Sequence, residues 1–123
     1  MTVRLIEFDW KQGELAEGLR RYEAGEFFAA HEAWEDVWLR SPEPDRAFLQ
    51  GLIQVAAAFH HLQKHNLRGA MALLHAALQK FARFPDSYGG LSVASLRDDI
   101  RERLRSLEAG EPVLPIRIPT LSL

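Results

Sequence analysis

Residues 26–40 carry the sequence EFFAAHEAWEDVWLR, which is rich in aromatic side chains. At about 100° per residue, Phe27, Trp34 and Trp38 fall on one side of a helix. His31 and Glu35 come next around the same apolar arc, with aromatic residues on both sides. The segment therefore predicts an amphipathic helix with two polar residues set inside its aromatic face.

Outward from this segment, apolar residues recur at spacings of three and four along the rest of the chain. The spacing predicts four further helices, at residues 13–24, 45–65, 67–83 and, after a Ser92 cap, up to 109. Glycine and proline separate these segments, and no linker or repeat divides the chain. We therefore expect an all-α fold, a compact bundle of four to five helices forming a single domain over residues 1–123.

The end of the chain has a different pattern. Residues 111–123 contain Pro112, Pro115 and Pro119 between aliphatic residues, so neither a helix nor a central strand is expected there. We expect an extended Pro-rich C-terminal arm over 111–123, which lies on its own domain or reaches a second subunit. Residues 85–90 are expected to form a loop.

Composition narrows the class of protein. The chain has 123 residues and no cysteine, which excludes disulfides, thiolate zinc sites and a cysteine nucleophile. A cysteine-free chain fits a reducing compartment, so a cytoplasmic location is expected. Its 15 basic and 17 acidic residues give a net charge of −2, which argues against a dedicated nucleic-acid binder. No apolar run is long enough for a bilayer, and Arg4, Glu7 and Asp9 leave no secretory signal, so no membrane partner is expected.

His31 and Glu35 are the first candidate site residues, because they lie four residues apart on one helix face. A carboxylate inside an apolar face costs several kcal/mol unless it is paired, protonated or bound to a cation. Glu35 is therefore expected to have a partner, with His31 the nearest. Gln50, Gln54 and His61 fall close together along the border of the 45–65 helix and can hydrogen-bond across a helix contact.

Three interpretations of these five residues stay open. They form a structural network that fixes the packing of two helices, or they bind a small polar ligand or a divalent metal such as Zn, Fe or Mn. In the metal case His31, Glu35 and His61 are the ligands. The third interpretation is acid/base catalysis by Glu35 with His31 as its proton partner. Zinc-peptidase chemistry is not supported, because the H-E-x-x-H pattern that begins at His31 ends in glutamate.

The run Gly25-Glu26-Phe27-Phe28-Ala29-Ala30-His31-Glu32-Ala33-Trp34-Glu35-Asp36-Val37-Trp38 resembles a family signature, G-x-[FY]-x-x-A-H-E-x-x-E-x-x-W. The family is prokaryotic and is catalogued as domain of unknown function 309. Residues 50–61 and 66–70 resemble its second and third blocks, and 88–93 is similar to the turn before its last helix, so the likeness covers about 12–108. The resemblance implies an all-α bundle but no reaction. Its motif residues here are His31, Glu32, Glu35, Trp38, Gln50, Gln54 and His61.

Two hypotheses about function follow. In one, His31, Glu35 and His61 converge on a metal or small polar ligand in an open, concave site, and Gln54 orients it. In the other, the polar network only fixes packing, and an exposed aromatic patch of Phe27, Trp34 and Trp38 with the apolar arm recruits a partner or a second copy. That copy would make the protein a homo-oligomer.

Overall fold

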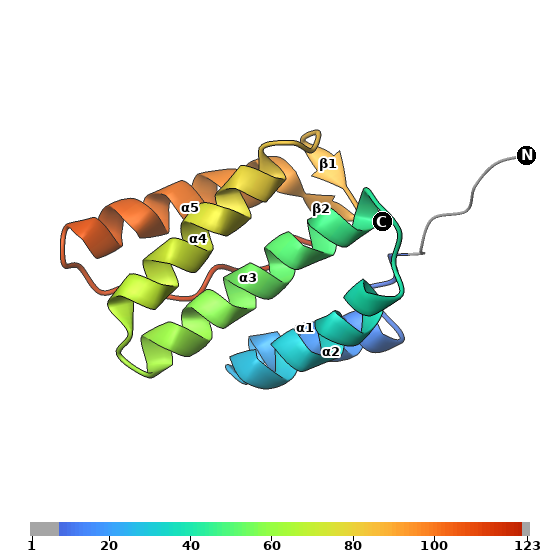
Figure 1. Cartoon of the computed structure of the whole chain (residues 1–123), viewed down its shortest axis with the longest axis horizontal. Coiled ribbons are helices and arrows are strands. Elements are labelled where there is room, and N and C mark those ends of the chain that lie inside the picture. Colours follow the sequence, from blue (N-terminus) through green and yellow to red (C-terminus); the bar gives the residue numbers. More distant parts are fainter. Residues whose placement is uncertain (1–7, 122–123) are drawn as a thin grey trace, which may run out of the picture.

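The predicted apolar stripes correspond to five helices in the computed structural model, which describes residues 8–121 (Figure 1). The all-α helical bundle expected from the sequence is confirmed. The helices are α1 (Glu14–Glu23), α2 (Phe27–Leu39), α3 (Asp45–Gln63), α4 (Leu67–Phe81) and α5 (Val93–Glu108). Over residues 8–121, none of them has the length and apolar character needed to cross a membrane.

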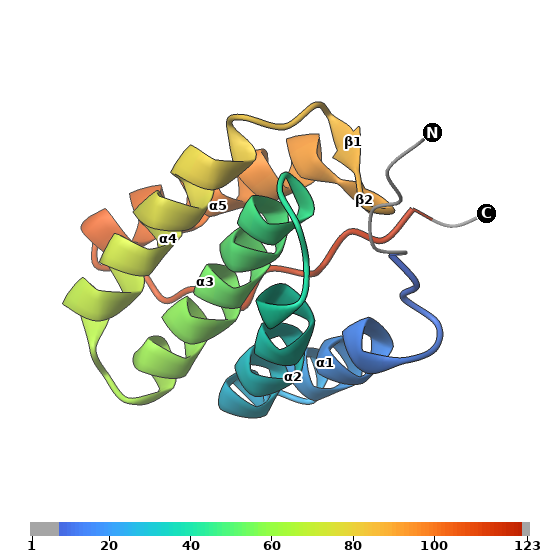
Figure 2. The same ribbon diagram turned by 45° about the vertical axis from the view of Figure 1, so that its right-hand side comes forward.

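Helix α3 lies at the centre of the bundle, with α2 on one side and α4 on the other (Figures 1 and 2). Helix α1 packs on α2, and α5 packs on α4. The central place of α3 follows from its sequence, because apolar residues occupy most of its circumference and Phe48, Leu52 and Val55 have no exposed surface. Among its polar residues, Arg46 and His60 contact Trp38 and Phe28 of α2.

Two helix starts are fixed by side chains that accept backbone N–H groups. The Asn66 side chain accepts a hydrogen bond from the Gly69 amide at the start of α4, and Ser92 accepts one from the Ser95 amide at the start of α5. Each cap provides a partner for a backbone donor that the first helical turn leaves unpaired. The predicted Ser92 cap is therefore confirmed.

The segment expected to be only a loop at residues 85–90 contains half of a β-hairpin. Strand β1 (Ser87–Tyr88) pairs antiparallel with β2 (Leu91–Ser92). Gly89 and Gly90 join the strands with φ of 58° and 76°, as a two-residue hairpin turn requires. The Tyr88 hydroxyl donates to the Asp45 carboxylate and so ties the hairpin to the start of α3.

From the end of α5 to residue 121 the chain forms no helix and runs back across the bundle behind α3, where it is coloured red in Figure 2. Ile116 and Ile118 are buried, and the buried Tyr22 hydroxyl donates to the Ile116 carbonyl at 2.5 Å. Beyond them, Thr120 forms an isolated antiparallel bridge with Leu91. In this structure the arm lies on its own helices and adds to their core.

The buried Tyr22 hydroxyl predicts a loss of stability in alkaline solution. Burial raises the pKa of Tyr22 above its ordinary value of about 10. The unfolded chain therefore releases this proton at a lower pH than the folded chain, so the stability is fully present below pH about 10 and declines as the pH rises further. Burial and the bond to Asp45 raise the pKa of Tyr88 in the same direction. Urea unfolding between pH 8 and 12 should show this decline, with a shallower slope in Tyr22→Phe; an equal slope in that variant would contradict the assignment.

Candidate ligand site between α2 and α3

Residues of α2 and α3 face each other along a line that we call the α2–α3 seam: Phe28, His31, Glu35 and Trp38 from α2, and Arg46, Gln50, Gln54, Ala57, His60 and His61 from α3. The two helices run in opposite directions. At one end the Arg46 guanidinium lies 4.3 Å from the centre of the Trp38 ring. At the other end the ring centres of Phe28 and His60 are 5.3 Å apart. Gln50 and Gln54 follow Arg46 at steps of four residues, so helical spacing places them on the same face of α3 as Arg46.

His31 and Glu35 form the expected pair within α2. The His31 Nε2 atom lies 3.2 Å from a Glu35 carboxylate oxygen, and the two side chains are 28% and 46% exposed. The expectation that Glu35 is a buried carboxylate is wrong, because nearly half of its side chain reaches solvent. The core side of α2 is formed by Phe27, Ala30, Trp34 and Val37, which turns residues 31 and 35 toward the edge.

The same rotation of α2 overturns the predicted aromatic surface patch. Phe27 and Trp34 are 4% and 0% exposed and belong to the core, and Trp38 is half-buried at the seam. The exposed aromatic residue of this helix is Phe28, at 52%. The periodicity of the sequence predicted an apolar arc that is wider than the face that α2 buries. It did not show which edge of that arc is exposed to solvent.

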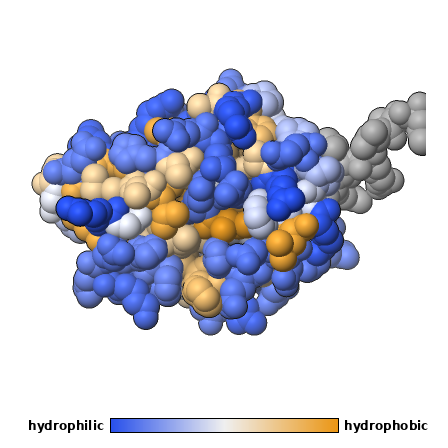
Figure 3. Space-filling view, viewed as in Figure 1, coloured by the Kyte–Doolittle hydropathy of each residue, from blue (hydrophilic) through white to orange (hydrophobic). Residues whose placement is uncertain are grey.

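A cavity of about 190 Å³ opens at one end of the seam, lined by Phe28, His31, Ala57, His60 and His61. It brings together His31 and His61, two of the residues singled out from the sequence. His60 and Phe28 also line it. Figure 3 shows orange, hydrophobic side chains near the centre of one face of the molecule, with blue, hydrophilic side chains around them. The site thus combines imidazole groups with apolar walls.

Gln50 and Gln54 lie one helical turn apart on α3 and are half-buried. Neither is among the residues that line the cavity, and over residues 8–121 neither is hydrogen-bonded to His31 or Glu35. The hydrogen bonds expected across the helix contact are therefore not formed. Within the same residues, no three histidine, aspartate or glutamate side chains group closely enough to hold a metal ion.

Three polar side-chain atoms within residues 8–121 are buried without a hydrogen-bond partner: His31 Nδ1, Trp38 Nε1 and Gln54 Oε1. All three belong to the α2–α3 seam. Buried polar atoms are nearly always hydrogen-bonded, so three exceptions along one seam need an explanation, of which a role in ligand binding is one. All three residues are positions of the family motif, and two of them, His31 and Gln54, are also predicted site residues.

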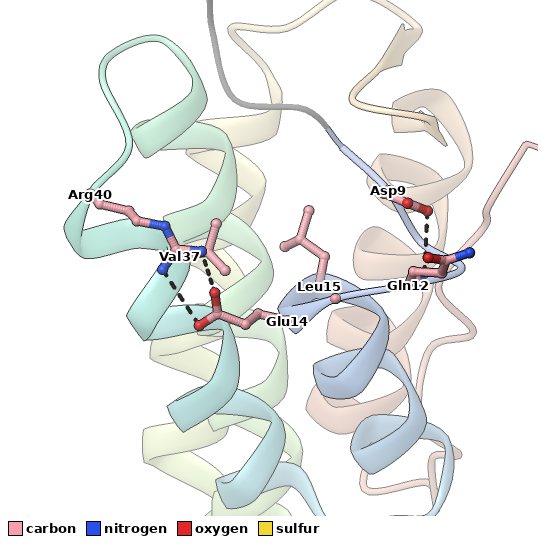
Figure 4. A pocket seen from close by; sticks show the side chains of 7 residues that line it. Asp9, Gln12, Glu14, Leu15, Val37 and Arg40 are labelled. Carbon is pink, nitrogen blue, oxygen red and sulfur yellow. Dashed lines mark hydrogen bonds and ion pairs between the residues drawn. The ribbon is translucent and has the colours of Figure 1, made fainter.

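A second cavity, of about 330 Å³, lies beside the start of α1 and the end of α2 (Figure 4). Its charged groups already have partners. Arg40 is paired with Glu14, and the Asp9 carboxylate accepts hydrogen bonds from the amides of Lys11 and Gln12. This cavity therefore offers a ligand fewer unpaired groups than the seam does.

Comparison with known proteins places a family model and a relative beside this chain. The chain is 30% identical over 110 residues to an uncharacterized protein of Aquifex aeolicus (strain VF5). The similar region covers 89% of this chain and 33% of the relative, so the chain spans about a third of the relative's length. The model of a family described as Domain of unknown function matches residues 15–73, from α1 into α4, which include every residue of the seam. Over residues 15–73 the chain matches the DUF309 family model, which confirms the resemblance seen in its sequence.

Proposed function

We propose that the α2–α3 seam binds a small ligand with a flat apolar body and a polar head that both donates and accepts hydrogen bonds. The ligand-binding residues are His31, Glu35, Gln50, Gln54 and His61. The observation that carries this proposal is that three buried polar atoms along the seam have no hydrogen-bond partner, and that one of them belongs to His31, which lines the cavity together with His61.

The energetics of the seam support a ligand over a purely structural network. A buried polar atom without a hydrogen bond costs about 1–3 kcal/mol. A network that served only packing would satisfy its own members, as the Asn66 and Ser92 caps do elsewhere in this fold. A ligand head that reaches His31 and Gln54 removes part of that cost when it binds.

The walls of the cavity suggest the shape of the ligand body. Phe28 offers a ring that is 52% exposed, and Ala57 leaves space beside it. A volume of about 190 Å³ suits one aromatic ring with a small substituent rather than a larger cofactor. Glu35, 3.2 Å from His31 Nε2, would hold that imidazole in a fixed orientation for the ligand.

A divalent metal at His31, Glu35 and His61 is the competing ligand for the same residues. A carboxylate beside a histidine nitrogen is a common arrangement around metals, which favours this alternative. It requires Glu35 and His61 to move toward His31 when the ion binds. Titration with Zn²⁺ alone distinguishes the two, because a metal site would saturate at one equivalent and a hydrogen-bonding site would not.

The wider setting that we propose is a cytoplasmic protein that does not bind nucleic acid or a membrane, in line with its lack of cysteine and net charge of −2. The alternative function is an interaction module, in which exposed Phe28 rather than Phe27 or Trp34 would contact a partner or a second copy. A concentration-dependent mass together with no saturable ligand would favour that module.

Titration with benzamide tests the proposed site, because this probe has a flat ring and an amide head. We expect saturable changes in the backbone amide NMR signals of α2 and α3, with a Kd of about 1 mM for so small a ligand. Ala57→Leu should fill the cavity and abolish binding while the fold is kept. Ala72→Leu, on the exposed side of α4, is the matched control and should bind as the wild type does. Benzamide binding that survives Ala57→Leu, or no saturable binding to the wild type, would contradict the proposal.

A further inference from the structure

Asn66 connects the cavity to the start of α4. Its Oδ1 atom accepts a hydrogen bond from the Gly69 amide at 3.0 Å, which caps the helix. Its Nδ2 atom lies 2.9 Å from Nδ1 of His61, one of the residues that line the cavity. One side chain therefore joins a backbone cap to an imidazole of the proposed site.

The cap determines which end of the Asn66 amide faces His61. A backbone N–H can only donate, so the atom that meets the Gly69 amide is the amide oxygen. The atom that meets the imidazole is then the NH₂ group, which can only donate. It follows that His61 Nδ1 is the acceptor in this bond and that the proton of the neutral ring is on Nε2.

Gly69 leaves the space that this arrangement needs. A Cβ atom at position 69 would lie 2.6 Å from Asn66 Nδ2 and 3.1 Å from His61 Nδ1. Any larger residue would displace the amide or the imidazole. The Asn66–His61 contact is therefore built into the close approach of the end of α3 to the first turn of α4.

We propose that Asn66 is a positioning residue that fixes His61 as a hydrogen-bond donor through Nε2, so that the cavity selects ligands with an acceptor group, such as an amide or carboxylate oxygen. This inference rests on the proposed function of the seam. The same tautomer of His61 disfavours metal binding, because a metal coordinates the lone pair of Nε2 and therefore requires the ring proton to be on Nδ1. That proton would point at the Asn66 NH₂ group.

Asn66→Asp tests the inference with little change in shape. Aspartate caps a helix as well as asparagine does, but it places a carboxylate oxygen where the NH₂ group was. His61 should then carry its proton on Nδ1. Asn66→Ser is the matched control, since serine keeps the cap but is too short to reach His61.

The first readout is ¹⁵N NMR of the His61 imidazole at about pH 9, which needs no ligand. We expect a proton on Nε2 in the wild type, on Nδ1 in Asn66→Asp, and a mixture of both in Asn66→Ser. A wild-type proton on Nδ1, or an unchanged tautomer in Asn66→Asp, would overturn the inference whether or not benzamide binds. If the tautomers behave as expected but benzamide does not bind, the result would contradict the proposed function and not the role of Asn66.

The second readout is selectivity. Benzoate and benzylamine share a ring but carry an acceptor head and a donor head. We expect the wild type to prefer benzoate, and Asn66→Asp to reverse this preference and to bind Zn²⁺ at least about tenfold more tightly. Equal Zn²⁺ affinity in the wild type and Asn66→Asp, together with an unchanged order of the two probes, would count against a role for Asn66 in selectivity.

Discussion

Gly18→Ala is expected to lower the free energy of unfolding by about 3 kcal/mol, the opposite of its usual effect. In an exposed helix interior the same change stabilises by about 1 kcal/mol, because alanine is the best helix former and glycine one of the worst. Gly18 lies inside α1 and is buried against α2. The sign of the expected change in the free energy of unfolding is therefore determined by packing between α1 and α2 and not by helix propensity.

The packing leaves no room for a methyl group. A Cβ atom at Gly18 would lie 2.2 Å from Nε1 and 2.4 Å from Cδ1 of Trp34. The indole cannot move aside easily, because it has no exposed surface and its Nε1 donates to the Leu15 carbonyl at 3.1 Å. Overpacking of this kind typically costs 1–3 kcal/mol, and here the loss of an indole hydrogen bond is added.

A double-mutant cycle separates this contact from other effects. Trp34→Leu is itself destabilising, by about 3 kcal/mol, but it removes the indole atoms that the new methyl would meet. In the Trp34→Leu background, Gly18→Ala should therefore cost less than about 0.5 kcal/mol or become stabilising. Urea unfolding of the four proteins measures the coupling. Equal effects of Gly18→Ala in both backgrounds would show that this helix contact is not what the substitution disturbs.

The helices were predictable because their signals are local. Apolar residues spaced three and four apart, glycine and proline at the ends, and the Ser92 cap are all readable without knowing what each helix packs against. The hairpin had a local signal too, since Gly89-Gly90 between short segments is a two-residue turn sequence. It was missed because two strands of two residues each carry no periodicity.

The site was only partly predictable, because it depends on how α2 is rotated. The apolar arc of α2 contains Phe27 and Phe28, of which one is 4% and the other 52% exposed. Nothing in the spacing distinguishes these neighbours. Only contact with α1 and α3 decides, and the same rotation carries Glu35 out of the core.

Asn66 lies between two predicted helices, and no periodicity in the sequence reveals its contact with His61. The local signal for its cap was present, since asparagine before a helix with a donor three residues later is a common start. Its second bond, to an imidazole five residues earlier, follows from the turn geometry between α3 and α4. A short turn that returns a cap toward the preceding helix can thus set the chemistry of a neighbouring side chain.

Ile116→Ala is the second substitution with a large expected effect, a loss of about 3 kcal/mol in the free energy of unfolding. Ile116 has no exposed surface, and its carbonyl accepts the hydrogen bond from Tyr22. Removing a buried isoleucine side chain down to alanine costs 2–5 kcal/mol, depending on how far the surroundings close over the cavity. Leu114→Ala is the control, because Leu114 is 78% exposed on the same arm and should change stability by less than about 0.5 kcal/mol.

The same pair of variants decides whether the arm belongs to its own domain or to a second copy. An arm that packs on its own helices gives an unfolding midpoint that is independent of protein concentration in the wild type and in both variants. An exchanged arm would make the midpoint rise with concentration, since folding would then include association. If Ile116→Ala costs as little as Leu114→Ala, the arm is not part of the cooperative core. Hydrogen exchange should then give the backbone amides of the arm an opening free energy far smaller than the free energy of global unfolding. If Ile116→Ala costs several kcal/mol at every protein concentration, α1, α2 and the arm unfold together. The contact between Tyr22 of α1 and Ile116 of the arm is then part of one cooperative core.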